Sequence, residues 1–174
     1  MIAITHIVFA LFFYFIFLKI SSFSFSTLIF LAIILGSVFP DVDATNSWLN
    51  RQTGFTKIFS LVKHRGFFHS LFGLLLFSSI GILLFLYLGL NLHYIFAFSS
   101  GYFMHLVADS LTVTGIRWFW KKGHLKWKIK TATFSEGLFF LALLLISFFV
   151  FNKEIKEFKE LTAELTATIV KFFK

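Results

Sequence analysis

The segment Leu92–Ile116 reads LHYIFAFSSGYFMHLVADSLTVTGI and is apolar over a length that can cross a bilayer. Within it stand His105 and Asp109, and ionisable residues at membrane depth are costly enough to indicate function. Residues four apart share one face of a helix. The pair therefore predicts metal ligands or a general acid/base pair, with a purely structural hydrogen bond between helices as the alternative.

The composition indicates a membrane protein. Of the 174 residues, 58% are hydrophobic, 29 are phenylalanine, and only 14% are charged, whereas an ordinary soluble domain is about a quarter charged. Helices suit such a chain because they satisfy their own backbone groups in lipid. There is no cysteine, so disulfides and cysteine-ligated metals are excluded. The net charge of +8 is typical of loops facing anionic lipid headgroups, and we expect no nucleic-acid partner.

Five apolar segments predict five transmembrane helices in an all-α, polytopic bundle. Residues 1–152 form the predicted transmembrane domain, and residues 153–174 form a charged, amphipathic C-terminal helix with apolar residues every three or four positions. Between the last two spans lies a basic, aromatic loop, Arg117–Lys130, which resembles an interfacial belt. The predicted spans are Ile2–Leu18, Thr27–Phe39, Leu71–Leu90, Leu92–Ile116 and Gly137–Phe151.

Alternation of these spans brings most of the unusual polar residues to one side of the membrane. Basic residues concentrate in the loops of that side, so the positive-inside rule predicts that the N-terminus and the site face the cytoplasm of an inner or plasma membrane. His93 falls on the other side and His124 in the basic loop, and both are expected to be structural. The residues predicted to converge are His6, Asp41, Asp43, His64, His69, His105, Asp109 and Glu136.

Neutral imidazoles mixed with carboxylates suit a divalent metal, zinc first and manganese or iron as alternatives. The number of candidate ligands allows one or two ions: His6, Asp41, Asp43, His64, His69, His105 and Asp109. Such an ion would lower the pKa of a bound water toward about 7. Asp109 or Glu136 is the expected general base, and the planar fork of Arg65 suits a phosphate. The alternative for Asp41 and Asp43 is a purely structural role, as a turn and helix N-cap after Pro40.

Several blocks of the chain resemble a known family. They are Thr5-His6, Phe39–Asp43, His64–Ser70 (HRGFFHS) and Gly101–Gly115 (GYFMHLVADSLTVTG), in this order. Together they are similar to the YdjM-like family of membrane-bound metal-dependent hydrolases, which is associated by name with the LexA repressor. The resemblance covers Thr5–Gly137, and Phe68 and Lys121 depart from the family pattern. The polar signature that it implies is His6, Asp41, Asp43, His64, Arg65, His69, Ser70, His105, Asp109 and Glu136.

The predicted function is therefore hydrolysis of a lipid or lipid-linked ester or phosphoester at the cytoplasmic membrane boundary. The spacing of His105 and Asp109 also resembles one short motif of zinc-dependent phospholipase C, which is analogy only. Two other functions stay open at this point. One is a metal or proton transporter, which would need ligands on toward the opposite face. The other is a non-enzymatic membrane anchor or regulatory protein, acting through the basic stretch Lys121–Lys130.

Overall fold

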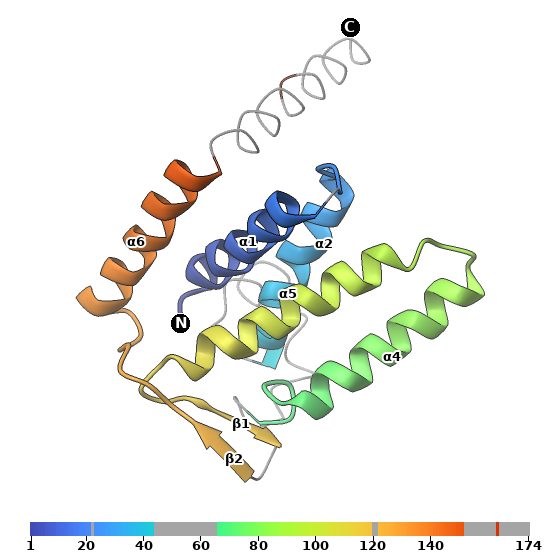
Figure 1. Cartoon of the computed structure of the whole chain (residues 1–174). Helices are drawn as coiled ribbons and strands as arrows, with labels where there is room; N and C mark the ends of the chain where they lie inside the picture. Colours follow the sequence, from blue (N-terminus) through green and yellow to red (C-terminus); the bar gives the residue numbers. More distant parts are fainter. Residues whose placement is uncertain (22, 44–65, 120–121, 152–162, 164–174) are drawn as a thin grey trace, which may run out of the picture.

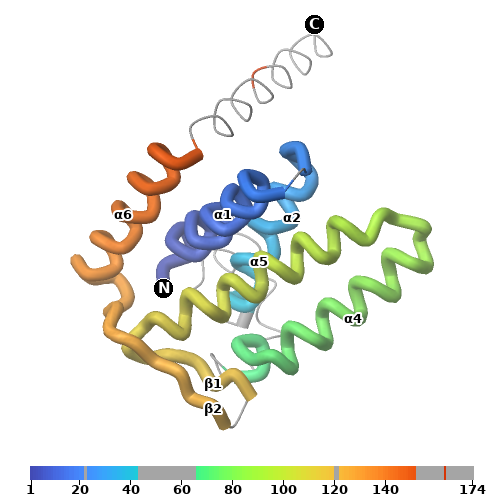
Figure 2. The backbone as a smooth tube through the Cα atoms, viewed as in Figure 1, coloured from blue at the N-terminus to red at the C-terminus, as the bar shows by residue number. Residues whose placement is uncertain are grey.

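The computed structural model describes residues 1–21, 23–43, 66–119, 122–151 and 163. The predicted C-terminal amphipathic helix, 153–174, lies outside these residues except for one position. The described chain is mainly helical, as predicted, and Figures 1 and 2 show the helices packed beside one another. Its helices are α1 (Ala3–Ile20), α2 (Thr27–Val38), the short 3-10 helix η1 (Phe39–Asp43), α4 (Leu71–Tyr87), α5 (His93–Ser110) and α6 (Phe134–Val150).

Local sequence sets where these helices begin and end. The side chain of Ser26 accepts a hydrogen bond from the backbone N–H of Ile29 at the start of α2, and Ser70 does the same for Gly73 at the start of α4. Pro40 disfavours α conformation in the residue before it, and α2 ends at Val38, close to the predicted end at Phe39. After Val38 the chain continues as the 3-10 helix η1, which contains Asp41.

Successive helices run in alternating directions. The start of α1 lies against the end of α5, where the rings of His6 and His105 stack. The other end of α1 leads to Phe23, whose ring lies 6.5 Å from that of His93 at the start of α5. The start of α6 contacts the start of α1 through Glu136 and Ile2. One end of the molecule therefore gathers the N-terminus, the end of α5 and the start of α6 (Figure 1).

Two glycines allow α2 and α5 to cross in close contact. A Cβ atom added to Gly36 would lie 2.0 Å from the carbonyl oxygen of Phe98, and one added to Gly101 would lie 2.1 Å from that of Ile33. Small residues at helix interfaces permit such approach, and they are a common device of membrane helices. The crossing holds the backbone of Ser37 against α5 at Gly101, which lies one helical turn before His105.

The structure adds one element to the predicted all-α fold, a two-stranded antiparallel hairpin in the basic loop. It consists of β1 (Ile116–Phe119) and β2 (Lys122–Leu125). The predicted span to Ile116 was too long, because α5 ends at Ser110 and the β-branched run after it leaves the helix. There the backbone of Thr112 and Val113 bonds to Trp127 and Ile129.

One of the described helices is both long enough and apolar enough to cross a membrane. α1 has the 18 residues and the apolar composition of a span, while Thr27–Val42, Leu71–Tyr87 and Phe134–Val150 are apolar but shorter. α1 is one-third buried, so much of it faces outward. The five-span arrangement stays a prediction.

Candidate metal centre

Five of the predicted ligands meet at the end of the bundle that holds the N-terminus. His6 comes from α1, Asp41 from η1, His69 from the residue before the Ser70 cap of α4, and His105 and Asp109 from one face of α5. Four of them are at most 1% exposed, and the side chain of Asp41 is 19% exposed. Residues far apart in the sequence thus form one buried polar cluster.

The two ring nitrogens at the middle of this cluster face each other. His69 Nε2 and His105 Nε2 are 3.2 Å apart, and their rings are inclined at 65°. Asp41 Oδ1 lies 3.4 Å from His69 Nε2 and 3.8 Å from His105 Nε2. Asp109 Oδ2 lies 3.8 Å and 4.0 Å from the same two nitrogens.

These separations fit a divalent metal. Zinc binds nitrogen and oxygen ligands at about 2.0–2.2 Å, and a tetrahedral arrangement places two such ligands about 3.4 Å apart. Two sets of potential ligand atoms lie within 4.8 Å of one another, namely His6, His105 and Asp109, and Asp41, His69 and His105. A single imidazole nitrogen binds one ion, so His105 Nε2 cannot serve both sets at once.

The backbone of α2 fixes the protonation pattern of His105. Its Nδ1 lies 2.7 Å from the carbonyl oxygen of Ser37, and because a carbonyl only accepts, Nδ1 carries the hydrogen and donates. Nε2 is then the nitrogen with the free lone pair, directed into the cluster. An outer partner of this kind is typical of histidine ligands in metal sites.

His6 has a different relation to the cluster. Its ring stacks on that of His105 with 3.8 Å between centroids and 14° between planes. Lone pairs of imidazole lie in the ring plane, so those of parallel rings do not converge on one ion. Both His6 nitrogens are buried without a hydrogen-bond partner among the described residues, and Nε2 lies 3.4 Å from Asp109 Oδ1. The contact places His6 beside Asp109 rather than between His69 and Asp41.

Glu136, predicted as a catalytic base, is placed as a bridge between helix starts. Its Oε1 accepts the backbone N–H of Ile2 and its Oε2 accepts that of Ala132, both at 2.7 Å. Both carboxylate oxygens are thus engaged, and neither set of potential metal ligands includes them. The amino group of Met1, next to Ile2, donates to Asp109 Oδ1 at 2.8 Å, so this bridge adjoins the cluster.

Other candidates fall outside the described residues or away from the cluster. His64 and Arg65 lie outside the described part of the chain, as does the side chain of Asp43. His93, at the far end of α5, contacts Asn91 Oδ1 at 2.5 Å, and His124 in the hairpin contacts the carbonyl of Thr114. Both placements agree with a structural role. The carbonyl of Ser37 was missed, and only the paired glycines of α2 and α5 could have suggested it.

Comparisons with known proteins agree with the sequence motifs. The chain matches the family model described as YdjM inner membrane protein over residues 1–174. Searches among curated proteins and among solved structures gave no match. The family match covers the whole length, including every residue of the buried cluster. The chain therefore belongs to the YdjM family of inner membrane proteins.

Proposed function

We propose that this protein is a metal-dependent hydrolase of the inner membrane that cleaves a lipid or lipid-linked ester or phosphoester. The observation that carries the proposal is the pair of facing Nε2 atoms of His69 and His105, 3.2 Å apart and flanked by two carboxylates. Two imidazole nitrogens and two carboxylates that meet in one buried site are a donor set that suits a divalent metal. We place the proposed site on the cytoplasmic side, because the basic residues of β1 and β2 follow the end of α5 that carries the cluster.

The three proposed metal ligands are Asp41, His69 and His105. His69 and His105 supply nitrogens whose rings are inclined to each other, and Asp41 supplies an oxygen within 3.8 Å of both. Their donor set suits zinc, with manganese or iron as alternatives. A divalent ion held by these residues would supply activated water for hydrolysis near neutral pH.

Asp109 is the proposed general base. Its Oδ2 lies within 4.0 Å of both ligand nitrogens, where it can accept a proton from the attacking water. Its Oδ1 is held by the amino group of Met1 and lies beside His6. The two oxygens of one carboxylate are thus divided between anchoring and proton transfer.

Transport is less well supported by the described residues. A transported ion would need further ligands toward the opposite face of the membrane. Between the cluster and His93, the facing surfaces of α1 and α5 line a pocket that is mostly apolar. Polar atoms in that region are engaged with backbone groups, as for Ser100 and the carbonyl of Phe96.

Elemental analysis of protein purified without chelators tests the metal centre. We expect about one ion per chain, with loss of the ion in His69→Ala and in His105→Ala. The matched control is His93→Ala, which removes a histidine from the opposite end of α5 and should keep the metal. Full metal content in both ligand variants, or no metal in the wild-type protein, would rule out the proposed centre.

A hydrolysis screen against membrane lipid extracts tests the chemistry. Asp109→Asn should retain the metal but lower turnover by about 10²–10⁴-fold, as expected for removal of a general base. If metal-loaded wild-type protein releases no product from any lipid fraction, hydrolysis is the wrong chemistry. If Asp109→Asn loses the metal as well, Asp109 is a ligand and not the base.

A further inference from the structure

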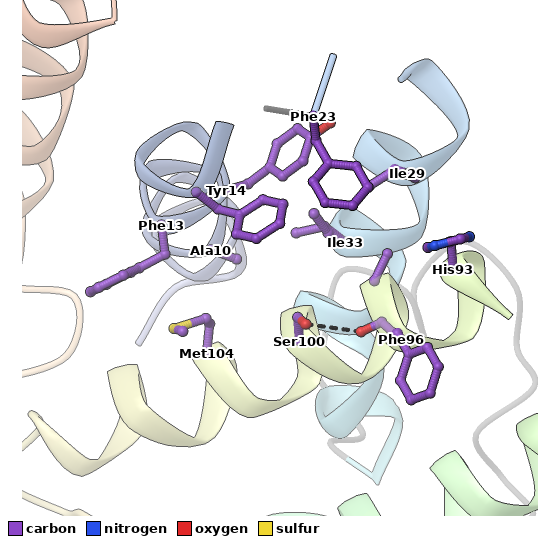
Figure 3. A pocket seen from close by; sticks show the side chains of 12 residues that line it. Ala10, Phe13, Tyr14, Phe23, Ile29, Ile33, His93, Phe96, Ser100 and Met104 are labelled. Atoms are coloured by element: carbon purple, nitrogen blue, oxygen red, sulfur yellow. Dashed lines mark hydrogen bonds between the residues drawn. The ribbon is translucent and has the colours of Figure 1, made fainter. Parts of the chain in front are cut away.

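An apolar pocket lies between α1, α2 and α5, and Figure 3 shows the side chains that line it. Its volume is about 340 Å³, within the range of small-molecule sites. Nine of its twelve lining residues are apolar or aromatic without a polar group; the other three are Tyr14, His93 and Ser100. The chemical character of the walls is therefore that of hydrocarbon.

The pocket begins next to the metal centre and runs away from it. On α1 its lining residues Ala10, Tyr14 and Phe17 continue the helix face of His6, at spacings of four, four and three residues. On α5 it extends from Met104, the neighbour of His105, back to His93. At 1.5 Å per residue, the pocket lining spans about 10 Å along α1 and about 16 Å along α5. Figure 3 shows Met104 and His93 at its opposite ends.

Each of the three polar residues of the walls has a side-chain atom with a partner within the fold. Tyr14 Oη accepts the backbone N–H of Ser26, Ser100 Oγ donates to the carbonyl of Phe96, and His93 Nδ1 contacts Asn91. A polar ligand would gain little from these groups and would lose its hydration. A hydrocarbon chain loses no hydrogen bonds on entering.

The rim of the pocket is open to the surroundings of the helices. Phe17 is 47% exposed and Phe96 is 56% exposed, and they belong to helices α1 and α5 on either side. α1 is the described helix with both the length and the apolar composition of a membrane span, so we place this rim against bilayer hydrocarbon. A lipid chain can enter sideways without crossing water.

We infer that this pocket holds one acyl chain of a membrane glycerophospholipid, with the carboxyl end of the chain toward the metal centre and the methyl end toward His93. The inference rests on the proposed function, because it places the ester bonds of that lipid beside His69 and His105. Apolar burial gives little driving force between two hydrocarbon environments. The pocket therefore acts by aligning the chain, which brings the reacting bond to the site.

Photolabelling of the full-length protein in phospholipid vesicles tests the pocket directly. Two probes are used, each a phosphatidylglycerol whose palmitoyl chain carries a diazirine, near its carboxyl end in one probe and at its methyl end in the other. We expect the first to label residues around Ala10 and Met104, and the second to label residues around Phe17 and His93. The labelled positions are read by peptide mass spectrometry.

A pair of matched variants shows whether labelling depends on the pocket. Ser100→Trp fills the middle of the pocket from an exposed position, and it should lower labelling of α1 severalfold. Ser79→Trp makes the same change at an exposed position of α4 that does not line the pocket, and labelling should stay at the wild-type level. Equal thermal unfolding midpoints of the two variants verify that the fold is retained.

The outcomes separate this inference from the proposed hydrolysis. Labelling spread evenly over α4 and α6, labelling in the reverse order along α1, or labelling unchanged by Ser100→Trp would each overturn the inference. Because labelling needs neither metal nor turnover, an ordered labelling pattern in a protein without hydrolytic activity would support the chain site and refute only the chemistry. Hydrolysis of lipid without the ordered labelling pattern would support the proposed chemistry and refute the chain site.

Discussion

Replacement of Gly101 by alanine tests whether the close crossing of α2 and α5 orients the metal centre. The new Cβ would lie 2.1 Å from the carbonyl oxygen of Ile33 and 2.9 Å from its carbon, where real Cβ contacts essentially never fall under 3.0 Å. The two helices must therefore separate locally by about 1 Å, and overpacking of this kind costs about 1–3 kcal/mol of stability.

The same displacement reaches the metal ligand one turn further on. His105 Nδ1 and the carbonyl oxygen of Ser37 are 2.7 Å apart, and an added separation of about 1 Å exceeds the hydrogen-bond range, which ends near 3.2 Å. Loss of the outer partner of a histidine ligand lowers metal affinity by about 10–100-fold. Competition with a chromophoric chelator measures this affinity, and thermal unfolding measures the stability.

The control is the same substitution at Gly137 in α6, where an added Cβ meets nothing within 4 Å. Alanine in a helix there should stabilise by about 0.5–1 kcal/mol and leave metal affinity unchanged. If Gly101→Ala loses stability but binds metal as tightly as the wild-type protein, the helix crossing does not orient His105 and the reasoning is refuted.

Two further changes probe the cluster and its neighbour. A chelator should lower the thermal unfolding midpoint of the wild-type protein by about 5–10 °C for a chain of this size, since an ion at 100 times its dissociation constant adds about 2.7 kcal/mol of stability. In Asp41→Asn the midpoints with and without chelator should be equal. If the full difference persists in this variant, the ion is bound elsewhere. Glu136→Gln should lower the free energy of unfolding by about 1–3 kcal/mol and leave the metal content unchanged, because a side-chain amide cannot accept hydrogen bonds from both Ile2 and Ala132. Loss of lipid hydrolysis at wild-type stability would instead identify Glu136 as the catalytic base.

Much of the helical pattern could be predicted, because long apolar runs have few structures open to them. The end of α2 near Phe39 followed from Pro40, and the start of α4 at Leu71 followed from the change to an apolar run. The end of α5 did not follow. Thr112 and Val113 are apolar enough for a span, but β-branched residues paired with Ile129 prefer extended backbone, and that pairing is invisible in a hydropathy pattern.

The residue types of the candidate site and their position at one end of the bundle could be predicted from the sequence. The role of each residue within the site was harder to predict. Alternating helices bring His6, Asp41, His69, His105 and Asp109 together whatever the details of packing. Which histidines face each other depends on side-chain orientation, as the stacking of His6 on His105 shows. The anchoring of Glu136 by two backbone N–H groups depends on the geometry of the helix starts, which the sequence does not specify.

The position of the cluster along its helices has a consequence for the surrounding bilayer. At 1.5 Å per residue, His6 lies about 21 Å along α1 from Ile20, and His105 lies about 18 Å along α5 from His93. A hydrocarbon core is about 30 Å thick, so with the far helix ends at one boundary the cluster lies roughly 10 Å below the other. Hydrophobic mismatch of this kind is relieved by local thinning of the bilayer. A dimple in the leaflet nearer to the cluster would lower water and phospholipid headgroups to the histidines, and activity should rise in vesicles made from shorter-chain lipids.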